Sequence, residues 1–388
     1  MKILYVTNGD DKYGAASSLK ELIQLEMGMD NIEIEVLNTE HNGLNKWCDE
    51  RKIKNYSFKY YESLYSKQVP WFKYVPKYVV KMCLYYVYNY IQLHRVEKTI
   101  DMNTIDIIHS NTGTIDFGAK LAKRNHIKHV WHLREFGKED FNCYAMKPAL
   151  YRWMSENGGN FIAISKAIKN SWVKKGIDGK KIHVLYHGIP TNNLKVNNNA
   201  CGKFPLKMIF MAAIREYKGQ HQAIEAINMM SEENKAKIRL DIYGNANSVY
   251  GEYLKSLIAK YRLEKCVTLK GFADSKKVLS EYDIGLNCSK NEGLGRFTLE
   301  YMASGLLVIA SNTGANTEII NKNNGMVYKY EDIKSLKYAI EQCILLQSKS
   351  KALITQSLKD VNEKFDIEKN YIKFVKLYRN ILEEKDIF

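Results

Sequence analysis

The sequence DIGLNCSKNEGLGRFTLEYMASGLLVIASNTGANTEII, residues 283–320, holds the strongest indication of the fold. A buried strand is predicted to end near Ser289, a loop with Gly293 and Gly295 follows, and a helix is expected to begin at Phe297. Glycines in such a loop let the backbone come close to a ligand, and the free N–H groups at a helix start favour an anion such as phosphate. The stretch therefore predicts a strand, loop and helix unit that can bind a phosphorylated ligand.

Two better-known phosphate-binding motifs do not match this stretch. No lysine follows the glycines as in a Walker A loop, and G-L-G-R-F-T lacks the third glycine of a dinucleotide fingerprint. Glu292 and Glu300 lie eight residues apart, one before the turn and one within the predicted helix. The first can face the polar head of a ligand, and the second can accept hydrogen bonds from neighbouring hydroxyls such as those of a ribose.

On both sides of this stretch, short apolar runs alternate with helix-length segments. Such runs suit buried parallel strands, and the alternation is typical of α/β domains. The predicted strands are 2–7, 32–37, 105–110, 128–133, 160–165 and 181–186 in the first half, and 206–214, 238–244, 266–272, 283–289 and 306–311 in the second. We predict two doubly wound domains, 1–190 and 206–365, with a polar linker at 191–205 and a ligand cleft between the domains. A C-terminal helix, 366–388, is expected to cross back to the first domain.

The composition is that of an ordinary folded protein. The chain has 388 residues, of which 45% are hydrophobic and 26% charged. Its seven cysteines never form C-x-x-C, which argues against a disulfide framework or a zinc knuckle and favours a reducing compartment. The start, MKILYVTNGDDKYG, is typical of a strand and turn rather than of a signal peptide, and the longest uncharged aromatic and aliphatic stretch, 82–93, is shorter than the about 20 residues of a spanning helix. We therefore expect a cytoplasmic protein without a transmembrane helix.

The net charge of +15, from 58 Lys and Arg against 43 Asp and Glu, favours an anionic partner. Residues 51–100 concentrate this character, with ten basic side chains against two acidic ones and ten of the 27 tyrosines. This insertion can be a pair of helices that packs on the first domain. It can equally be a surface for an anionic membrane, where each basic residue contributes about 1 kcal/mol. No nucleic-acid-binding module accompanies the charge, so nucleic acid is not expected as a partner.

The segment E-G-L-G-R-F-T-L-E resembles the E-x7-E motif of retaining glycosyltransferases of family 4. Proteins of that family have the GT-B fold, an α/β architecture of two facing Rossmann-like domains with a cleft between them. Other phrases of the sequence agree with the resemblance: AAIREYKGQHQAIEA at 212–226, HLREF at 132–136, AISKAI at 163–168 and LYHGI at 185–189. The resemblance covers nearly the whole chain and is weakest over 40–100.

The resemblance implies a role for each matching residue. Glu300 would bind the nucleotide ribose, Glu292 would contact the hydroxyls of the donor sugar, and His132 would lie beside that sugar. Arg215 and Lys218 would hold the donor diphosphate, whose charge grows as the glycosidic bond breaks. The implied catalytic residues are His132, Arg215, Lys218 and Glu292. The implied donor-binding residues are Gly14, Ala15, Gly244, Gly293, Gly295, Arg296, Phe297, Thr298 and Glu300.

Simpler interpretations of some of these residues stay open. Lys218 and Arg215 can be solvated charges at a helix start, and Arg215 matches the family less well because it lies only three residues before Lys218. His132 can be a core histidine at a strand end. Arg134 and Glu135 can form an internal ion pair.

The resemblance also implies a mechanism with retention of anomeric configuration by front-face attack. In such a reaction the leaving phosphate can take the proton of the acceptor hydroxyl, so no carboxylate nucleophile is needed. The chain contains no D-x-D, the carboxylate pair that often holds a metal bound to the diphosphate. We therefore predict that no metal and no other cofactor is required.

We expect a hexosyl- or N-acetylhexosaminyl-type glycosyltransferase (EC 2.4.1.-) with a nucleotide-sugar donor, UDP-linked by preference. The expected acceptor is a polyprenyl-diphosphate-linked saccharide in capsule, exopolysaccharide or O-antigen synthesis, reached by a protein peripheral to the inner face of the cell membrane. The alternatives are transfer to a protein or small soluble acceptor, a nucleotide-sugar epimerase, and a non-catalytic GT-B subunit of a glycosylation complex. Nucleic-acid binding is the weakest alternative, because only the net charge supports it.

Overall fold

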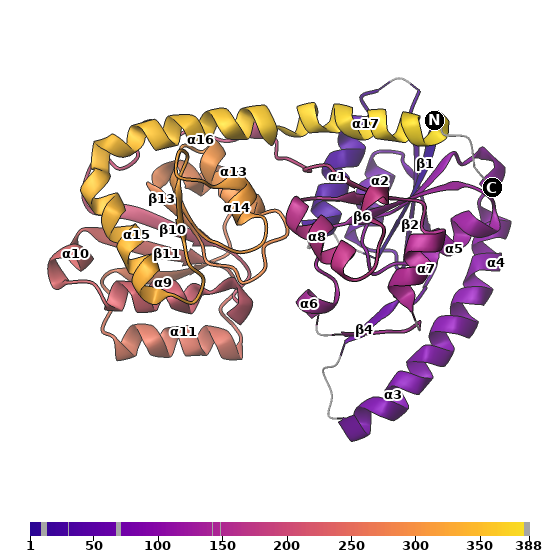
Figure 1. Ribbon diagram of the computed structural model, residues 1–388, viewed down its shortest axis with the longest axis horizontal. Helices are drawn as coiled ribbons and strands as arrows, with labels where there is room; N and C mark the ends of the chain where they lie inside the picture. The colour runs from indigo at the N-terminus through magenta and orange to yellow at the C-terminus, as the bar shows by residue number, and fades with distance from the viewer. Residues whose placement is uncertain (9–13, 30, 67–70, 142, 148, 384–388) are drawn as a thin grey trace. The chain divides into compact units, whose positions relative to one another are not determined.

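The computed structural model describes residues 1–8, 14–29, 31–66, 71–141, 143–147 and 149–383. Within these ranges the chain divides into two compact units, His187–Asn370 and a first unit that combines Met1–Tyr186 with the C-terminal stretch from Tyr371. Each unit has a parallel sheet with helices against it, so the two Rossmann-like domains and the helical C-terminal segment expected from the sequence are confirmed (Figure 1).

The first unit is built on a seven-stranded sheet of order β3-β2-β1-β5-β6-β8-β9, in which each neighbouring pair is parallel. Its strands are β1 (Lys2–Thr7), β2 (Glu33–Asn38), β3 (Lys54–Ser57), β5 (Ile107–Ser110), β6 (Lys128–Leu133), β8 (Asn160–Ala163) and β9 (Ile182–Val184). A small antiparallel pair, β4 (Leu64–Ser66) and β7 (Cys143–Ala145), is separate from it. Strand β2 lies on one side of β1 in the sheet, and β5 lies on the other side. The strand order therefore reverses at β1, and α/β sheets commonly bind ligands at the position of such a reversal.

Both faces of this sheet are covered by helices. On one face, Ile3 and Tyr5 of β1 pack in a core with α1, α2 and α17. On the other face, Leu4 and Val6 pack with α4 and α5, because successive strand residues point to opposite sides. The helices of the first unit are α1 (Gly14–Glu26), α2 (Gly43–Glu50), α3 (Trp71–Cys83), α4 (Asn89–Thr99), α5 (Phe117–Arg124), α6 (Lys138–Phe141), α7 (Leu150–Asn157), α8 (Lys166–Lys174) and α17 (Ile367–Glu383), of which α17 begins in the second unit.

The basic, Tyr-rich insertion begins with an edge strand, β3, that the sequence analysis did not predict. From Trp71 to Thr99 it is one uninterrupted helical run, α3, the π-helical segment η1 (Leu84–Tyr88) and α4, rather than a pair of helices (Figure 1). Tyr85, Leu93 and Val96 are buried on one side of this run, whereas Val80, Val87 and other apolar side chains are exposed. Within the described ranges, no helix is long and apolar enough to cross a membrane.

The second unit has a six-stranded sheet of order β12-β11-β10-β13-β14-β15, again parallel between all neighbours. Its strands are β10 (Leu206–Met211), β11 (Ile238–Tyr243), β12 (Val267–Gly271), β13 (Ile284–Asn287), β14 (Leu307–Ser311) and β15 (Met326–Tyr328). Five of these strands are expected from the sequence, whereas the short edge strand β15 is not. Since β10 pairs with both β11 and β13, the order reverses at β10, and ligands are expected at the carboxyl ends of these strands.

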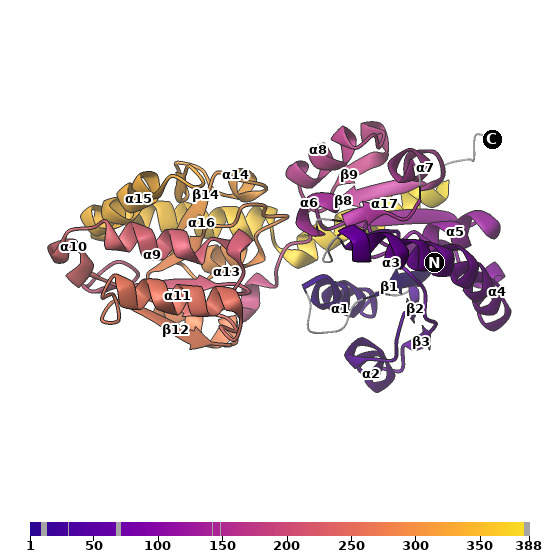
Figure 2. The same cartoon turned by 90° about the horizontal axis from the view of Figure 1, so that it is seen from below.

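Helix α9 packs beside α11 and α15, and α13 packs beside α14 and α16 (Figure 2). The stretch 191–205, expected to be a linker, is folded onto this unit: Cys201 is buried in its core, and the backbone N–H of Cys201 donates to Asp283. The helices are α9 (Gln220–Asn228), α10 (Glu232–Ala236), α11 (Val249–Lys260), α12 (Ser275–Val278), α13 (Arg296–Ala303), α14 (Asn316–Ile319), α15 (Ile333–Leu346) and α16 (Lys351–Lys364). The 3₁₀ turns of the chain are η2 (Met102–Thr104), η3 (Gly179–Lys181), η4 (Thr191–Asn193), η5 (Glu216–Lys218), η6 (Leu279–Glu281) and η7 (Gln347–Ser350).

Candidate active site

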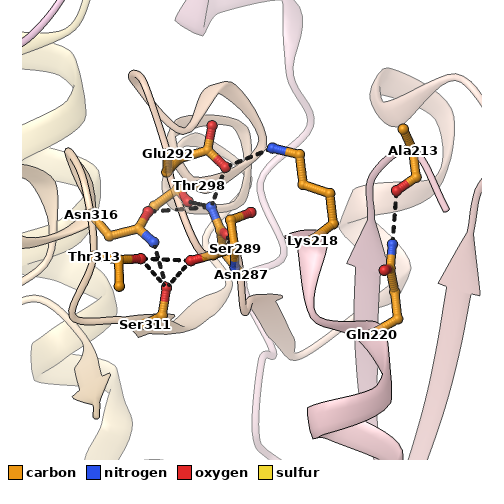
Figure 3. A network of polar contacts seen from close by, with 10 residues as sticks. All are labelled: Ala213, Lys218, Gln220, Asn287, Ser289, Glu292, Thr298, Ser311, Thr313 and Asn316. Atoms are coloured by element: carbon orange, nitrogen blue, oxygen red, sulfur yellow. Dashed lines mark hydrogen bonds and ion pairs between the residues drawn. The ribbon is translucent and has the colours of Figure 1, made fainter. Parts of the chain in front are cut away.

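Strand β13 ends in a buried asparagine that ties together the loops at the carboxyl edge of the second sheet. The side-chain amide of Asn287 donates to Thr298 Oγ1 at 2.8 Å and to Asn316 Oδ1 at 3.2 Å. Asn316 opens α14, and its own amide donates to Ser311 Oγ at 3.1 Å. The loops after β13 and β14 are therefore joined by buried amide and hydroxyl groups, as Figure 3 shows.

A single backbone carbonyl strengthens this junction. The hydroxyls of Ser311 and Thr313 both donate to the carbonyl oxygen of Ser289, at 2.8 and 2.5 Å (Figure 3). Because a buried polar network in which the groups are paired fixes one arrangement, the loop that leads to α13 is held in place before any ligand binds.

The backbone of Glu292 is fixed by the β14–α14 loop, residues 312–315. The N–H of Ala315 donates to the carbonyl of Glu292 at 2.8 Å. Gly314 has a φ of +55°, and a Cβ there would overlap the backbone of Glu292. Only glycine combines this left-handed conformation with so close an approach. Gly314 therefore lets one loop press directly on the other.

Lys218 and Glu292 form an ion pair between two loops. Lys218 Nζ lies 3.0 Å from Glu292 Oε2, and their side chains are 21% and 15% exposed (Figure 3). Lys218 ends the turn η5 between β10 and α9, and the loop is held against its neighbour by a 2.7 Å hydrogen bond from the N–H of Lys290 to the carbonyl of Tyr217. The pair predicted from the sequence as two members of one site is thus in direct contact.

The charge of Lys218 offsets the burial of Glu292. Burial by itself would raise the pKa of the Glu292 carboxyl, but the positive charge and hydrogen bond of Lys218, together with hydrogen bonds from Ser289 and Asn287, hold that pKa below its ordinary value. Glu292 is therefore ionised at neutral pH, and it is an acceptor of hydrogen bonds rather than a proton donor.

The first turn of α13 begins after a glycine. Its N-cap residue, Gly295, has a φ of +75° and makes no side-chain cap hydrogen bond, so the first amides of the helix are not capped by it. The helix begins at Arg296, one residue before the expected start. Arg296 Nε donates to Glu300 Oε1 at 3.0 Å, whereas the buried Glu300 Oε2 accepts no hydrogen bond from the described residues.

The other predicted residues of the second unit have more varied settings. Gly293 lies in the same loop as Glu292, and the ring of Phe297 stacks on Tyr301 at 6.4 Å between centroids. Arg215 is exposed and has no side-chain hydrogen bond or ion pair with the described residues. Gly244 follows β11, and a Cβ there would overlap the carbonyl of Ala212, so its close packing alone explains a glycine.

The remaining predicted residues, His132, Gly14 and Ala15, belong to the first unit. His132 is buried in β6, and its Nδ1 lies 3.3 Å from His109 Nε2. Gly14 opens α1, where a Cβ would have nothing within 4 Å, and the carbonyl of Ala15 accepts a 3.2 Å hydrogen bond from Asn111. A glycine is therefore not required by packing at position 14.

Arg134 and Glu135, considered as an ion pair, contact different groups. Arg134 Nε donates to the carbonyl and the side-chain oxygen of Asn111, at 3.1 and 3.0 Å, and burial lowers the pKa of Arg134 to about 10. Glu135 Oε1 accepts a 2.6 Å hydrogen bond from the N–H of Gly113, and burial raises the pKa of this carboxyl to about 8. Their separate partners give each residue its own structural role at the end of β6.

The described residues include no group of three or more His, Cys, Asp or Glu side chains that could hold a metal ion. Five residues of this network were not expected from the sequence to belong to the site: Asn287, Ser311, Thr313, Gly314 and Asn316. Apart from Gly314, they share one signal, a polar residue at or just after the end of an apolar strand, in LNCS and IASNTGAN. Because such positions meet at one edge of a parallel sheet, a polar residue there could have indicated a place in the site.

Two family models match the chain, one in each half. Residues 54–193 match the model described as Glycosyltransferase Family 4, and residues 196–360 match the one described as Glycosyl transferases group 1. The second match contains Lys218, Glu292 and Glu300, and the first contains His132.

Three relatives show similar levels of identity. An uncharacterized glycosyltransferase of Methanocaldococcus jannaschii, MJ1069, is 26% identical over 76% of this chain and 77% of its own length. The amylovoran biosynthesis glycosyltransferase AmsK of Erwinia amylovora is 26% identical over 57% of this chain and 52% of its own. The GtfA subunit of the UDP-N-acetylglucosamine–peptide N-acetylglucosaminyltransferase of Streptococcus pneumoniae is 24% identical over 64% of this chain and 52% of its own. The matched regions thus span about half of the latter two proteins.

The fold is also that of solved glycosyltransferase-like structures. The crystal structure of Anabaena HepE in complex with UDP-glucose has a TM-score of 0.75 to this chain at 19% identity, over 98% of this chain and 100% of HepE. This match shows that the chain has the two-domain GT-B fold, and the two family models, each over less than half of the chain, relate its halves in sequence to glycosyltransferases of group 1 and family 4, with homologues from polysaccharide biosynthesis.

Proposed function

We propose that this protein is a retaining glycosyltransferase that moves a sugar from a UDP-sugar to a lipid-linked saccharide during the synthesis of a surface polysaccharide. The observation that carries the proposal is the Lys218–Glu292 ion pair beside the first turn of α13, whose N-cap is Gly295, with Glu300 Oε2 unpaired among the described residues. A cation and the amides of a helix start suit a diphosphate, the Glu292 carboxylate suits a sugar hydroxyl, and the second carboxylate oxygen of Glu300 suits a ribose.

The donor nucleotide has a natural place for each of its polar parts. Glu300 Oε1 is held by Arg296, so Oε2 is left to accept hydrogen bonds from the ribose hydroxyls. The amides at the start of α13 would receive the diphosphate, and Arg215, which is exposed and directly precedes the turn that holds Lys218, would add a second cation. UDP is the favoured nucleotide, in keeping with the HepE complex with UDP-glucose.

Transfer would then proceed on one face of the sugar. The acceptor hydroxyl forms a bond to the anomeric carbon as the bond from that carbon to the UDP oxygen breaks, and a phosphate oxygen takes the hydroxyl proton. Lys218 and the helix amides stabilise the negative charge that develops on UDP. Glu292, which is ionised, would accept hydrogen bonds from donor-sugar hydroxyls instead of acting as the nucleophile. Cations and amides take the place of a metal in this scheme, so no metal is required.

The helical run α3–η1–α4 supports a membrane-linked acceptor. Six large apolar side chains on it are 44–63% exposed, and their spacing places them along one side of the helix. They are Val79, Val80, Tyr86, Val87, Tyr90 and Ile91. We call these six residues the apolar stripe. With the exposed Lys77, Arg95 and Lys98 on the same run, the stripe has the composition of a surface that lies on anionic lipid headgroups.

A protein acceptor is the second candidate, and the similarity to GtfA favours it. The two candidates differ in their need for lipid. Transfer to a lipid-linked saccharide requires vesicles that carry the acceptor, and it weakens when the apolar stripe is made polar. Transfer to a protein proceeds without vesicles and is insensitive to the stripe.

Calorimetry with UDP-, GDP-, ADP- and dTDP-sugars, without added metal, tests the donor site. We expect one UDP-sugar to bind the wild type, and Glu300→Gln to weaken this binding at least about tenfold through the ribose contact. Glu264→Gln is the matched control, because Glu264 is exposed just before β12, at the amino edge of the sheet. The absence of binding by any of the four nucleotides would contradict the proposal and favour a non-catalytic GT-B subunit.

A further inference from the structure

A series of buried polar side chains connects the C-terminal helix to His132 within the first unit. Its members are Glu26 at the end of α1, Tyr5 of β1, Tyr378 of α17, His109 of β5 and His132 of β6. All five are fully buried. Polar groups so deep in a core are costly unless they are hydrogen-bonded, so their arrangement has to be specified by one another.

The contacts link these five side chains one after another, from Glu26 to His132. Tyr5 Oη donates to Glu26 Oε1 at 2.6 Å, and it lies 3.4 Å from Tyr378 Oη. Tyr378 Oη lies 2.7 Å from His109 Nδ1. His109 Nε2 lies 3.3 Å from His132 Nδ1. His109 is therefore contacted at both ring nitrogens, and each contact constrains its tautomer.

The shorter of the two Tyr378 contacts decides where its hydrogen points. Tyr5 has only one hydroxyl hydrogen, and the 2.6 Å contact directs it to Glu26. Tyr378 can then donate to Tyr5 Oη at 3.4 Å or to His109 Nδ1 at 2.7 Å, and the closer imidazole nitrogen is the better acceptor. With Nδ1 accepting, a neutral His109 carries its proton on Nε2, which faces His132.

His109 is neutral in this environment. Burial, with the nearby charges of Arg134 and His129, keeps the pKa of His109 well below its usual value. A neutral His109 that donates from Nε2 makes His132 Nδ1 an acceptor, and a neutral His132 then carries its proton on Nε2.

We infer that Tyr378 and His109 are positioning residues that hold His132 as the Nε2–H tautomer, so that its Nε2 is the hydrogen-bond donor of the ring. This inference rests on the proposed function and on the role that the family resemblance implies for His132, which would lie beside the donor sugar and donate to one of its hydroxyls. The opposite tautomer presents a lone pair at Nε2 and loses that donor. The tautomer of His132 thus depends on a tyrosine at the far end of the chain, 269 residues from His109.

The test is the tautomer itself, read by ¹⁵N NMR of the full-length protein labelled in its nine histidines. The signals of His132 are assigned by their loss in His132→Gln. We expect the wild type to have His132 protonated on Nε2, and Tyr378→Phe to shift His132 toward the Nδ1–H form. Tyr371→Phe is the matched control, since Tyr371 is buried on the same helix and its hydroxyl has no hydrogen-bond partner among the described residues.

Substitutions of His109 give a second route should Tyr378→Phe fail to fold. His109→Gln keeps an N–H group that can donate to His132 Nδ1, and it is expected to retain the Nε2–H tautomer. His109→Leu removes the donor and is expected to lose it. A His132 that is protonated on Nδ1 in the wild type, or that keeps its tautomer in Tyr378→Phe and in His109→Leu alike, overturns the inference.

Kinetics and binding separate this inference from the proposed function. Tyr378→Phe should lower kcat for sugar transfer about tenfold or more while UDP binding stays unchanged, because the nucleotide is not the group that His132 contacts. Tyr371→Phe should leave kcat within about twofold. If the wild type transfers no sugar and binds no UDP-sugar, the proposed function fails, and the NMR measurement still decides the tautomer.

Discussion

The ammonium group of Lys218 lies 3.0 Å from the carboxylate of Glu292, although the two residues are 74 positions apart in the sequence. The contact exists because β10 and β13 are neighbours in the sheet and the loops that follow them leave from the same edge. In the proposed function, this contact holds a cation in place before the donor diphosphate binds.

Lys218→Ala should lower the rate of transfer about a hundredfold or more, because removal of one preorganised donor from a developing oxyanion has an effect of this size. The fold should survive, since the side chain is on the surface of a loop and 21% exposed. Steady-state kinetics with the UDP-sugar that binds, together with a thermal melt, checks this. Lys265→Ala, at an exposed position before β12, is the control, and a Lys218→Ala variant with unchanged turnover removes Lys218 from the site.

Gly314→Ala should abolish donor binding and lower stability by more than the about 1 kcal/mol of a left-handed alanine, because its Cβ would overlap the backbone of Glu292. The matched control is Gly271→Ala. Gly271 has a similar positive φ of +78°, but nothing lies within 4 Å of a Cβ there. Urea unfolding and UDP-sugar calorimetry compare the two variants. Equal losses in both would show that backbone strain, and not contact with Glu292, is what matters.

Glu26→Gln should flatten the pH dependence of stability between about pH 4.5 and pH 8. Burial raises the pKa of Glu26 from 4.5 to about 8, so in this window the folded chain keeps a proton that the unfolded chain releases. The wild type therefore loses stability as the pH rises, by up to about 1.4 kcal/mol per pH unit from this group. Glutamine does not ionise, so the variant lacks this contribution to the pH dependence. Urea midpoints at pH 5, 7 and 9, with Glu264→Gln as the control, measure it. A variant that follows the wild type at all three values contradicts the raised pKa.

Substitution of Lys73, Lys77 and Lys81 by glutamine should weaken sedimentation with anionic vesicles roughly a hundredfold, since three basic residues contribute about 1 kcal/mol each. Hydrolysis of the donor should not change. Neutral vesicles are the control for charge.

The apolar stripe makes a separate prediction. The double variant Val80→Asn and Val87→Asn should also reduce vesicle binding, because it removes apolar surface that would lie at the headgroup boundary. Val249→Asn is the matched control, since Val249 is 92% exposed in the second unit and has no place in the stripe. Equal sedimentation of the wild type and both multiple variants would leave the helical run with a structural role only.

Much of the fold was accessible from the sequence because buried parallel strands need apolar runs. The edge strands β3 and β15 were missed, since short strands with one solvent-facing side lack that signature. In the candidate site, Glu292 and Glu300 could be found because a glycine loop and a helix start lie between them in one continuous stretch. Asn287 and Asn316 could not be found, because an asparagine after a strand is typical of an ordinary turn, and its hydrogen-bond partners are visible only in the structure.

The sequence by itself determined two α/β domains and the glycine loop between Glu292 and Glu300, which is predicted to bind phosphate, because these depend on local periodicity and on residues close together in the chain. Only the tertiary structure decided which distant groups meet. Lys218 contacts Glu292 because β10 and β13 are neighbours in the second sheet. Tyr378 contacts His109 because α17 packs on the first sheet. Contacts of this kind depend on strand order and helix packing, which arise from burial over the whole domain and leave no mark in the local sequence.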